Sequence, residues 1–353
     1  MKTTRRTLFI ATAAVALTAA VWLWPHSTQP SQQDIQAMKT FTENMTTHCV
    51  GRFLIDAPTG VDTGVGTYGF QIAEIKPIQR STQPVEERLQ RLDRELAARV
   101  TAQATWKSVY GKPLDPAQLF SPRPDVRSIW YGKPDSDSKT SDQMDGYAVR
   151  PEGTFIFETG AFDQADVKEF NDFLTEIAPT LSVRDSSTIP TQPGFCFDNG
   201  FIAMNPKRGE SVEWGWSLPG HPKVYFGVSA RTNDDKVDEG ILDREADILK
   251  ELQAAIGVTG MTQVKTLRKR RFGLNGMAAQ EWLREITDDA PEYQFNLEIP
   301  GKPNDLANPS INLSLKVGGS SIKGHVKPSL TTGEAIALWD AVIQTLRLRP
   351  GAV

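Results

Sequence analysis

Cysteine and histidine are scarce in this sequence, which holds two cysteines and four histidines in 353 residues. The histidines are His26, His48, His221 and His325. Neither they nor the cysteines have the spacing of zinc ligands. A G-x-S-x-G nucleophile elbow is missing, because the segment 319–324 departs from that spacing by one residue. These absences predict a protein that is not an enzyme and that holds no cofactor and no metal ion.

An excess of positive charge is absent as well. The chain has 39 Lys and Arg against 43 Asp and Glu, and its first 30 residues contain three of the basic residues and none of the acidic ones. Without that segment the acidic excess rises to seven, which argues against nucleic acid and anionic lipid surfaces as partners. The basic run from Lys265 to Arg271 is predicted as a solvated strand edge. Carboxylate pairs such as Asp288-Asp289 are expected on loops or helix faces, where charge is normally solvated.

Long apolar runs are limited to one, at the N-terminus. Lys2, Arg5 and Arg6 precede an uncharged run of 17 residues, 8–24, which ends before Pro25. Residues 1–25 have the layout of a secretory signal peptide or of an uncleaved signal anchor in the inner membrane, and the run is near the lower limit for spanning a bilayer as a helix. Either alternative places the rest of the chain in the periplasm.

The remaining chain is long enough for two domains and shows signs of an internal duplication. The segments 49–58 and 196–206 both open with a cysteine and end at a proline, and each is predicted as a short strand. A second strand, recognised by its alternating pattern, follows in each half at 68–75 and 225–231. We therefore expect the two halves to have similar folds.

Amphipathic helices follow these strands, because apolar residues recur at spacings of three and four. They are Val85, Leu89, Leu92, Leu96 and Val100 in the first half, and Leu242, Ala246, Leu249, Leu252 and Ile256 in the second. Further strands are predicted at 126–131, 147–158, 263–272, 277–286, 293–299 and 311–317. Each half closes with another amphipathic helix, over 167–181 and 336–346.

This order of elements predicts an α+β protein of two similar layered domains, each an antiparallel sheet packed with helices. The stretch 26–40 is expected to be a polar linker that leads into an N-terminal domain over 41–185. Residues 186–194, rich in Ser, Thr and Pro, have the composition of a linker between domains. The C-terminal domain then spans 195–353.

The two cysteines, Cys49 and Cys196, stand at equivalent places in the two halves. The periplasm oxidises thiols, so one expectation is a disulfide that joins the domains. The alternative is that each cysteine is a small buried apolar residue of its own strand, since the sequence does not give the distance between their Cα atoms. Both alternatives stay open at this point.

The sequence resembles the two-domain immunity proteins for type VI secretion lipase effectors over nearly the whole chain after about residue 40. The likeness lies in Cys-Val-Gly-Arg-Phe at 49–53, Gly-Phe-Cys-Phe at 194–197, Ala-Ile-Ala-Leu-Trp-Asp at 335–340 and Leu-Arg-Leu-Arg-Pro at 346–350. It implies a periplasmic protein that binds a phospholipase effector, clamps its lid region with both domains and blocks access of substrate. No shared motif identifies the residues that contact the effector.

Two other classes fit the same composition. One is a non-enzymatic envelope scaffold or lipid-associated binding protein, which would form no stable complex with a lipase. The other is a hydrolase built on Ser, Asp and Glu, which would turn over substrate when purified alone.

Overall fold

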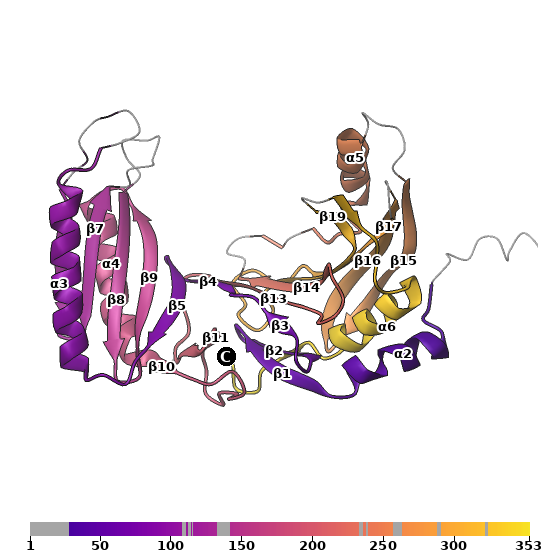
Figure 1. Cartoon of the computed structure of the whole chain (residues 1–353), viewed down its shortest axis with the longest axis horizontal. Helices are drawn as coiled ribbons and strands as arrows, with labels where there is room; N and C mark the ends of the chain where they lie inside the picture. Colours follow the sequence, from indigo (N-terminus) through magenta and orange to yellow (C-terminus); the bar gives the residue numbers. More distant parts are fainter. Residues whose placement is uncertain are drawn as a thin grey trace, which may run out of the picture.

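The fold is built on one antiparallel sheet of 13 strands that both halves of the chain share. The computed structural model describes residues 28–107, 111, 114, 116–132, 142–232, 236–237, 239–256, 263–287, 291–321 and 324–353. Figure 1 shows two lobes on either side of β4 and β13, the two central strands of the sheet.

Each half contributes six of these strands in the same order, read outward from the β4–β13 junction. In the first half they are β4 (Thr67–Phe70), β5 (Ala73–Arg80), β9 (Gly153–Ala161), β8 (Asp142–Arg150), β7 (Val126–Gly132) and β6 (Gln118–Arg123). In the second half they are β13 (Glu210–Ser217), β14 (Val224–Arg231), β18 (Ser310–Val317), β17 (Pro291–Ile299), β16 (Met277–Thr287) and β15 (Gln263–Leu274). The short strand β3 (Asp62–Thr63) also pairs with β13.

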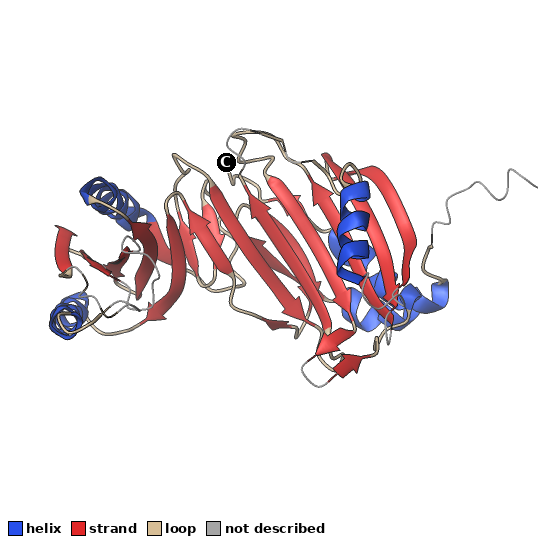
Figure 2. Cartoon of the chain, turned by 90° about the horizontal axis from the view of Figure 1, so that it is seen from above, coloured by secondary structure: helices blue, strands red, loops and turns tan. Residues whose placement is uncertain are grey.

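Helices cover this sheet at both ends. In the first lobe α3 (Val85–Gln103) packs Leu89, Leu92 and Leu96 onto one face, while α4 (Gln164–Ile177) covers the other. In the second lobe α5 (Glu245–Ile256) lies above the strands, and α6 (Thr332–Ile343) lies below them (Figures 1 and 2). The helix α2 (Gln32–Thr42) packs on α6, and a 3-10 turn, η1 (Ala178–Thr180), extends α4.

Two small sheets exchange elements between the halves. The hairpin of β1 (Met45–Val50) and β2 (Phe53–Pro58) receives β21 (Arg347–Leu348), from the end of the chain. The hairpin of β11 (Phe195–Phe197) and β12 (Gly200–Ile202) receives β10 (Leu181–Val183), from the end of the first half. A further pair, β19 (Gly319–Ser321) and β20 (Gly324–Val326), lies beside the large sheet. Each half therefore completes a sheet that the other half begins.

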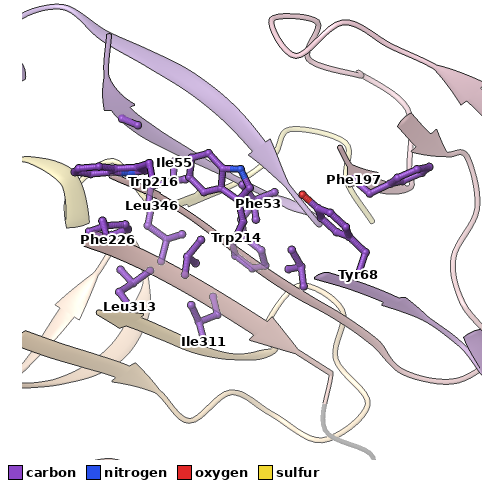
Figure 3. Packing of buried hydrophobic residues seen from close by; sticks show 14 of the residues in the cluster. Phe53, Ile55, Tyr68, Phe197, Trp214, Trp216, Phe226, Ile311, Leu313 and Leu346 are labelled. Carbon is purple, nitrogen blue, oxygen red and sulfur yellow. The ribbon is translucent and has the colours of Figure 1, made fainter. Parts of the chain in front are cut away.

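One apolar core runs through both lobes under the large sheet. Figure 3 shows Trp214, Trp216 and Phe226 of this sheet packed against Phe53 and Ile55 of β2. The rings of Trp216 and Phe226 stack with their centroids 5.2 Å apart. The first hairpin, although it belongs to the N-terminal half, thus covers the sheet of the C-terminal half.

The α+β class predicted from the sequence is confirmed, and the four amphipathic helices form close to the expected positions. Several predicted strands were wrong because tight turns divide them. The stretch 147–158 spans the turn between β8 and β9, and 68–75 spans the turn at Gln71, which has a φ of 55°. The segments 49–58 and 196–206 each contain a hairpin or part of one, with turns at Gly51-Arg52 and Asp198-Asn199.

The stretch 26–40, expected as a polar linker, contains most of α2. Ser31 and Asp34 form a reciprocal capping box at its start, and Met38 is buried against the rest of the protein. The predicted signal peptide or anchor, including residues 8–24, lies outside the described residues. Of the helices that the structure describes, none is long and apolar enough to cross a membrane.

Candidate functional site

The middle of the large sheet leaves one face open between α3 and α5. Side chains alternate along β13, so Val212, Trp214 and Trp216 point into the core while Glu213 and Gly215 point to the open side. The neighbouring strands β14 and β18 alternate in the same register. The open face is therefore continuous across strands from both halves of the chain.

Small and polar residues line this face, in contrast to the aromatic side beneath. On β13 and the four strands β4, β14, β18 and β17 they are Thr67, Gly69, Ser211, Glu213, Gly215, Gly227, Ser229, Asn312, Ser314 and Asn296. A polar surface of this kind is stable in contact with water, and it offers many hydrogen-bond donors and acceptors to a partner.

Two adjoining cavities occupy the face. One, of about 460 Å³, lies over Ser211, Arg231 and Ser310 and reaches Arg244 and Glu298. The other, of about 450 Å³, lies over Gly215, Gly227 and Ser314. They share Thr67, Glu213, Ser229 and Asn312 as lining residues, so together they form one trough along the sheet.

Tyr225 lies across two glycines in the second cavity. A Cβ atom on Gly215 would stand 2.4 Å from the Tyr225 hydroxyl oxygen, and one on Gly227 would stand 3.3 Å from its ring. Glycine weakens a strand interior, and it often marks a place where another group must approach closely. The paired glycines therefore let the ring, 48% exposed, lie against the sheet.

Charges on the face are mostly paired. Arg244 donates to both carboxylate oxygens of Glu298, at 2.9 and 2.7 Å, and Lys316 lies 3.1 Å from Glu292. Glu213 differs, because its exposed carboxylate makes no hydrogen bond or ion pair with any residue that the structure describes. It stands between the two cavities, as the single charged side chain among the described residues that line the second.

Cys49 and Cys196 are joined by a disulfide away from this face. Each is one residue short of the turn of its hairpin, opposite Leu54 and Phe201 respectively. The hairpins also meet through two hydrogen bonds between the backbones of Gly51 and Cys196, of 3.0 and 2.8 Å. The disulfide therefore joins the two exchanged sheets at equivalent points.

Two arginines, the half-buried Arg184 and the buried Arg349, hold this junction. Arg184 donates to the carbonyl oxygens of Cys49 and Phe197, each at 3.2 Å. Arg349 donates to the carbonyl oxygens of Pro190, Gln192 and Gly194, so it fixes the predicted inter-domain linker. Burial, together with the charges of Arg52 and Arg184, lowers the pKa of Arg349 to about 10. The carbonyl oxygens offset the cost of burying these cations.

The structure does not bring the histidines together. His26 lies outside the described residues, and His325 lies in β20 and does not line the trough. His48 packs against Trp214, and burial lowers the pKa of its imidazole. His221 shares a hydrogen bond of 3.2 Å with the Ser329 hydroxyl. No group of three His, Cys, Asp or Glu within the described ranges could hold a metal ion.

The predicted basic edge is β15, the last strand of the large sheet. Its charges are paired: Lys269 with Glu245, Arg271 with Asp243, and Arg268 with the buried Glu281. The carboxylate pairs Asp234-Asp235 and Asp288-Asp289 lie outside the described residues. Sequence reasoning missed the trough, although the alternation of Trp with Glu and Gly along β13 was a signal for a sheet with one open face.

Comparison with solved structures defines the class of protein that has this fold. The apo structure of immunity protein TplEi of the type VI secretion system from Pseudomonas aeruginosa matches with a TM-score of 0.67 and 21% identity, covering 87% of this chain and 98% of that one. The immunity chain of the crystal structure of the Tle4-Tli4 complex matches with a TM-score of 0.69 and 20% identity, covering 88% and 99%. TplEi complexed with "L" peptide matches with a TM-score of 0.65 and 22% identity, covering 88% and 99%. The chain has the fold of type VI immunity proteins.

The sequence itself narrows this class. Residues 188–351 match the family model of the Tle cognate immunity protein 4 C-terminal domain. The resemblance to immunity proteins for type VI lipase effectors is thereby confirmed. No curated protein sequence matches the chain.

Proposed function

We propose that this protein is an immunity protein that binds a type VI secretion phospholipase effector in the periplasm and inhibits it, with no chemistry of its own. The observation that carries the proposal is the match of residues 188–351 to the Tle cognate immunity protein 4 domain, on a fold shared with the Tle4-Tli4 complex. The catalytic serine would belong to the effector. Binding alone is then sufficient for protection.

The open face of the large sheet is the surface we assign to the effector. Strands from both halves form its floor, so a bound protein would contact both lobes. In this proposal the lobes clamp the lid region of the lipase and keep lipid from its active site. Nanomolar affinity corresponds to about −12 kcal/mol, and stable complexes of this kind bury about 1,600 Å² in total. A floor bordered by two lobes can supply that area.

The location follows from the N-terminal sequence. We propose that residues 1–25 export the chain, as a cleaved signal peptide or as an uncleaved anchor in the inner membrane. A mass measurement on the mature protein distinguishes the two, because cleavage removes the residues up to the processing site.

We also propose that the two halves arose by duplication and form the two functional domains, 41–185 and 195–353. Several equivalences support this. The halves contribute strands to the large sheet in the same order, and the cysteines occupy the same register in their hairpins. The residues that follow β10 and β21 make equivalent hydrogen bonds of 2.9 Å. The backbone N–H of Arg184 donates to the carbonyl oxygen of Asn199, and that of Arg349 donates to the carbonyl oxygen of Arg52. Each acceptor is the second turn residue of the hairpin that the strand joins.

The test uses a candidate cognate effector, a lipase with a G-x-S-x-G elbow that the proposal expects to be encoded beside this chain. Expressed in the periplasm of a host bacterium, that lipase should stop growth, and co-expression of the full chain should restore it. A variant with His221→Ala and His325→Ala should protect equally well. A chain that forms no complex with the lipase, or that hydrolyses phospholipid when purified alone, would overturn the proposal.

A further inference from the structure

We propose that the cavity between Glu213 and Tyr225 receives a lysine or arginine side chain of the lipase effector and anchors the complex. This inference rests on the proposed function and adds the chemistry of the contact. It follows from a recess that holds one unpaired carboxylate, one exposed aromatic ring and a set of neutral polar groups.

The carboxylate is placed to accept a cation. Glu213 projects from β13 on the same side as Gly215, two residues along the strand. Of the basic side chains around the trough, Arg244 and Lys316 are paired with Glu298 and Glu292, and Arg231, which lines the first cavity, makes no ion pair with Glu213. Glu213 is therefore left for a group that arrives from outside.

The ring supplies the second contact. A cation held over the face of a tyrosine ring gains from cation–π attraction, and more so when water is excluded, and the phenol oxygen can accept a hydrogen bond from it. Gly215 and Gly227 leave room for the ring of Tyr225 to lie against the sheet, with its outer side open to the cavity. Tyrosine is also among the residues that dominate binding energy in protein interfaces.

The rest of the lining fits a long cationic side chain. Asn312 and Ser314 offer oxygen acceptors to the N–H groups of a lysine or arginine, whereas the Asn296 side-chain oxygen already accepts a hydrogen bond from Arg284. Val65, 78% exposed, offers an apolar contact to the aliphatic stem of such a side chain. The acidic excess of the chain favours a partner surface with basic groups.

Isothermal titration with the same candidate lipase effector tests the inference with four single variants. We expect Glu213→Gln and Tyr225→Ala each to weaken binding at least tenfold. Glu87→Gln on α3 and Phe162→Ala, 70% exposed before α4, are matched controls and should stay within twofold. The affinity of Glu213→Gln should also fall less steeply with added salt than that of the unchanged protein, because a charge pair has been removed.

The two proposals fail in different ways. If the unchanged protein does not bind the lipase, the proposed function is wrong. If it binds and both Glu213→Gln and Tyr225→Ala keep full affinity, the immunity function stands and this anchor is wrong. An unchanged thermal unfolding midpoint for each variant verifies that folding is intact, as we expect when an exposed side chain is replaced.

Discussion

At the scale of single residues, the C-terminal half depends on one buried carboxylate. The carboxylate of Glu281 in β16 accepts a hydrogen bond of 2.8 Å from each of three side chains: Arg268, Arg270 and the indole of Trp339. Arg268 in turn bonds Asp340 of α6 at 2.9 Å. Burial alone would raise the pKa of Glu281, but the bonds from the two arginines hold it below its usual value of 4.5. The ionised carboxylate thus ties α6 to the sheet.

We therefore predict that the free energy of unfolding decreases in acid as Glu281 becomes protonated. Because the pKa of Glu281 is lower in the folded chain than in the unfolded one, its contribution is fully present above pH 4.5 and is lost as the pH falls through the folded pKa. Glu281→Gln should cost about 3 kcal/mol at pH 7, since it removes one of the two carboxylates that neutralise the buried Arg268 and leaves Asp340 alone with it. Urea unfolding at several pH values measures both effects. An unchanged free energy of unfolding for the variant at pH 7 would refute this role.

At the scale of elements, the disulfide joins two hairpins that lie 147 residues apart in sequence. Cys49, Cys196, Leu54 and Phe201 form a small apolar cluster of their own around it. The cross-link constrains the unfolded chain more than the folded one, where the hairpins already touch through Gly51.

Replacing both cysteines by alanine should destabilise the protein by about 4 to 5 kcal/mol, the entropic value for a loop of this length. Chemical unfolding under oxidising conditions measures the difference. The denatured, unreduced protein should show no free thiol on titration. Detection of two thiols would contradict the pairing.

Helices could be predicted well at this scale, whereas strand limits could not. A stripe of apolar residues such as Leu89, Leu92 and Leu96 extends over several helical turns, so it predicts the helix even when the predicted ends are off by a residue or two. The hairpins failed because their turns use left-handed residues other than glycine, among them Gln71 and Asn199, which interrupt no apolar pattern. Gly51, Asn199-Gly200 and Pro151-Glu152-Gly153 did carry conventional signs of a turn, which the strand predictions did not use.

At the scale of the whole molecule, the predicted linker does not separate two independent bodies. The sheet runs through the β4–β13 junction, and β10 and β21 cross between the halves. We predict that a chain with Cys49→Ala and Cys196→Ala, cut by an inserted protease site at the exposed Ser186-Ser187, still elutes as one particle in gel filtration. Separate elution of the two fragments without denaturant would show that the exchanged strands do not hold the halves together.

The candidate site was beyond reach of the sequence for the same reason. Tyr225 and Gly215 belong to different strands, and only the register of β13 with β14 places the ring over the glycine. Thr67 comes from the other half of the chain. Resemblance could indicate the class of partner, but positions in the trough depend on pairings between distant segments.

The exchange of β21 also sets the order of events during synthesis. Phe53 in β2 pairs with Leu348, which is made long after it, so the first hairpin stays open along one edge until Leu348 has been made. Pairings of such long sequence separation form slowly. In the proposed export, a chain that crosses the membrane unfolded would complete this small sheet only in the periplasm. Protection by a newly made molecule would then lag behind its export by the time that this final strand takes to dock.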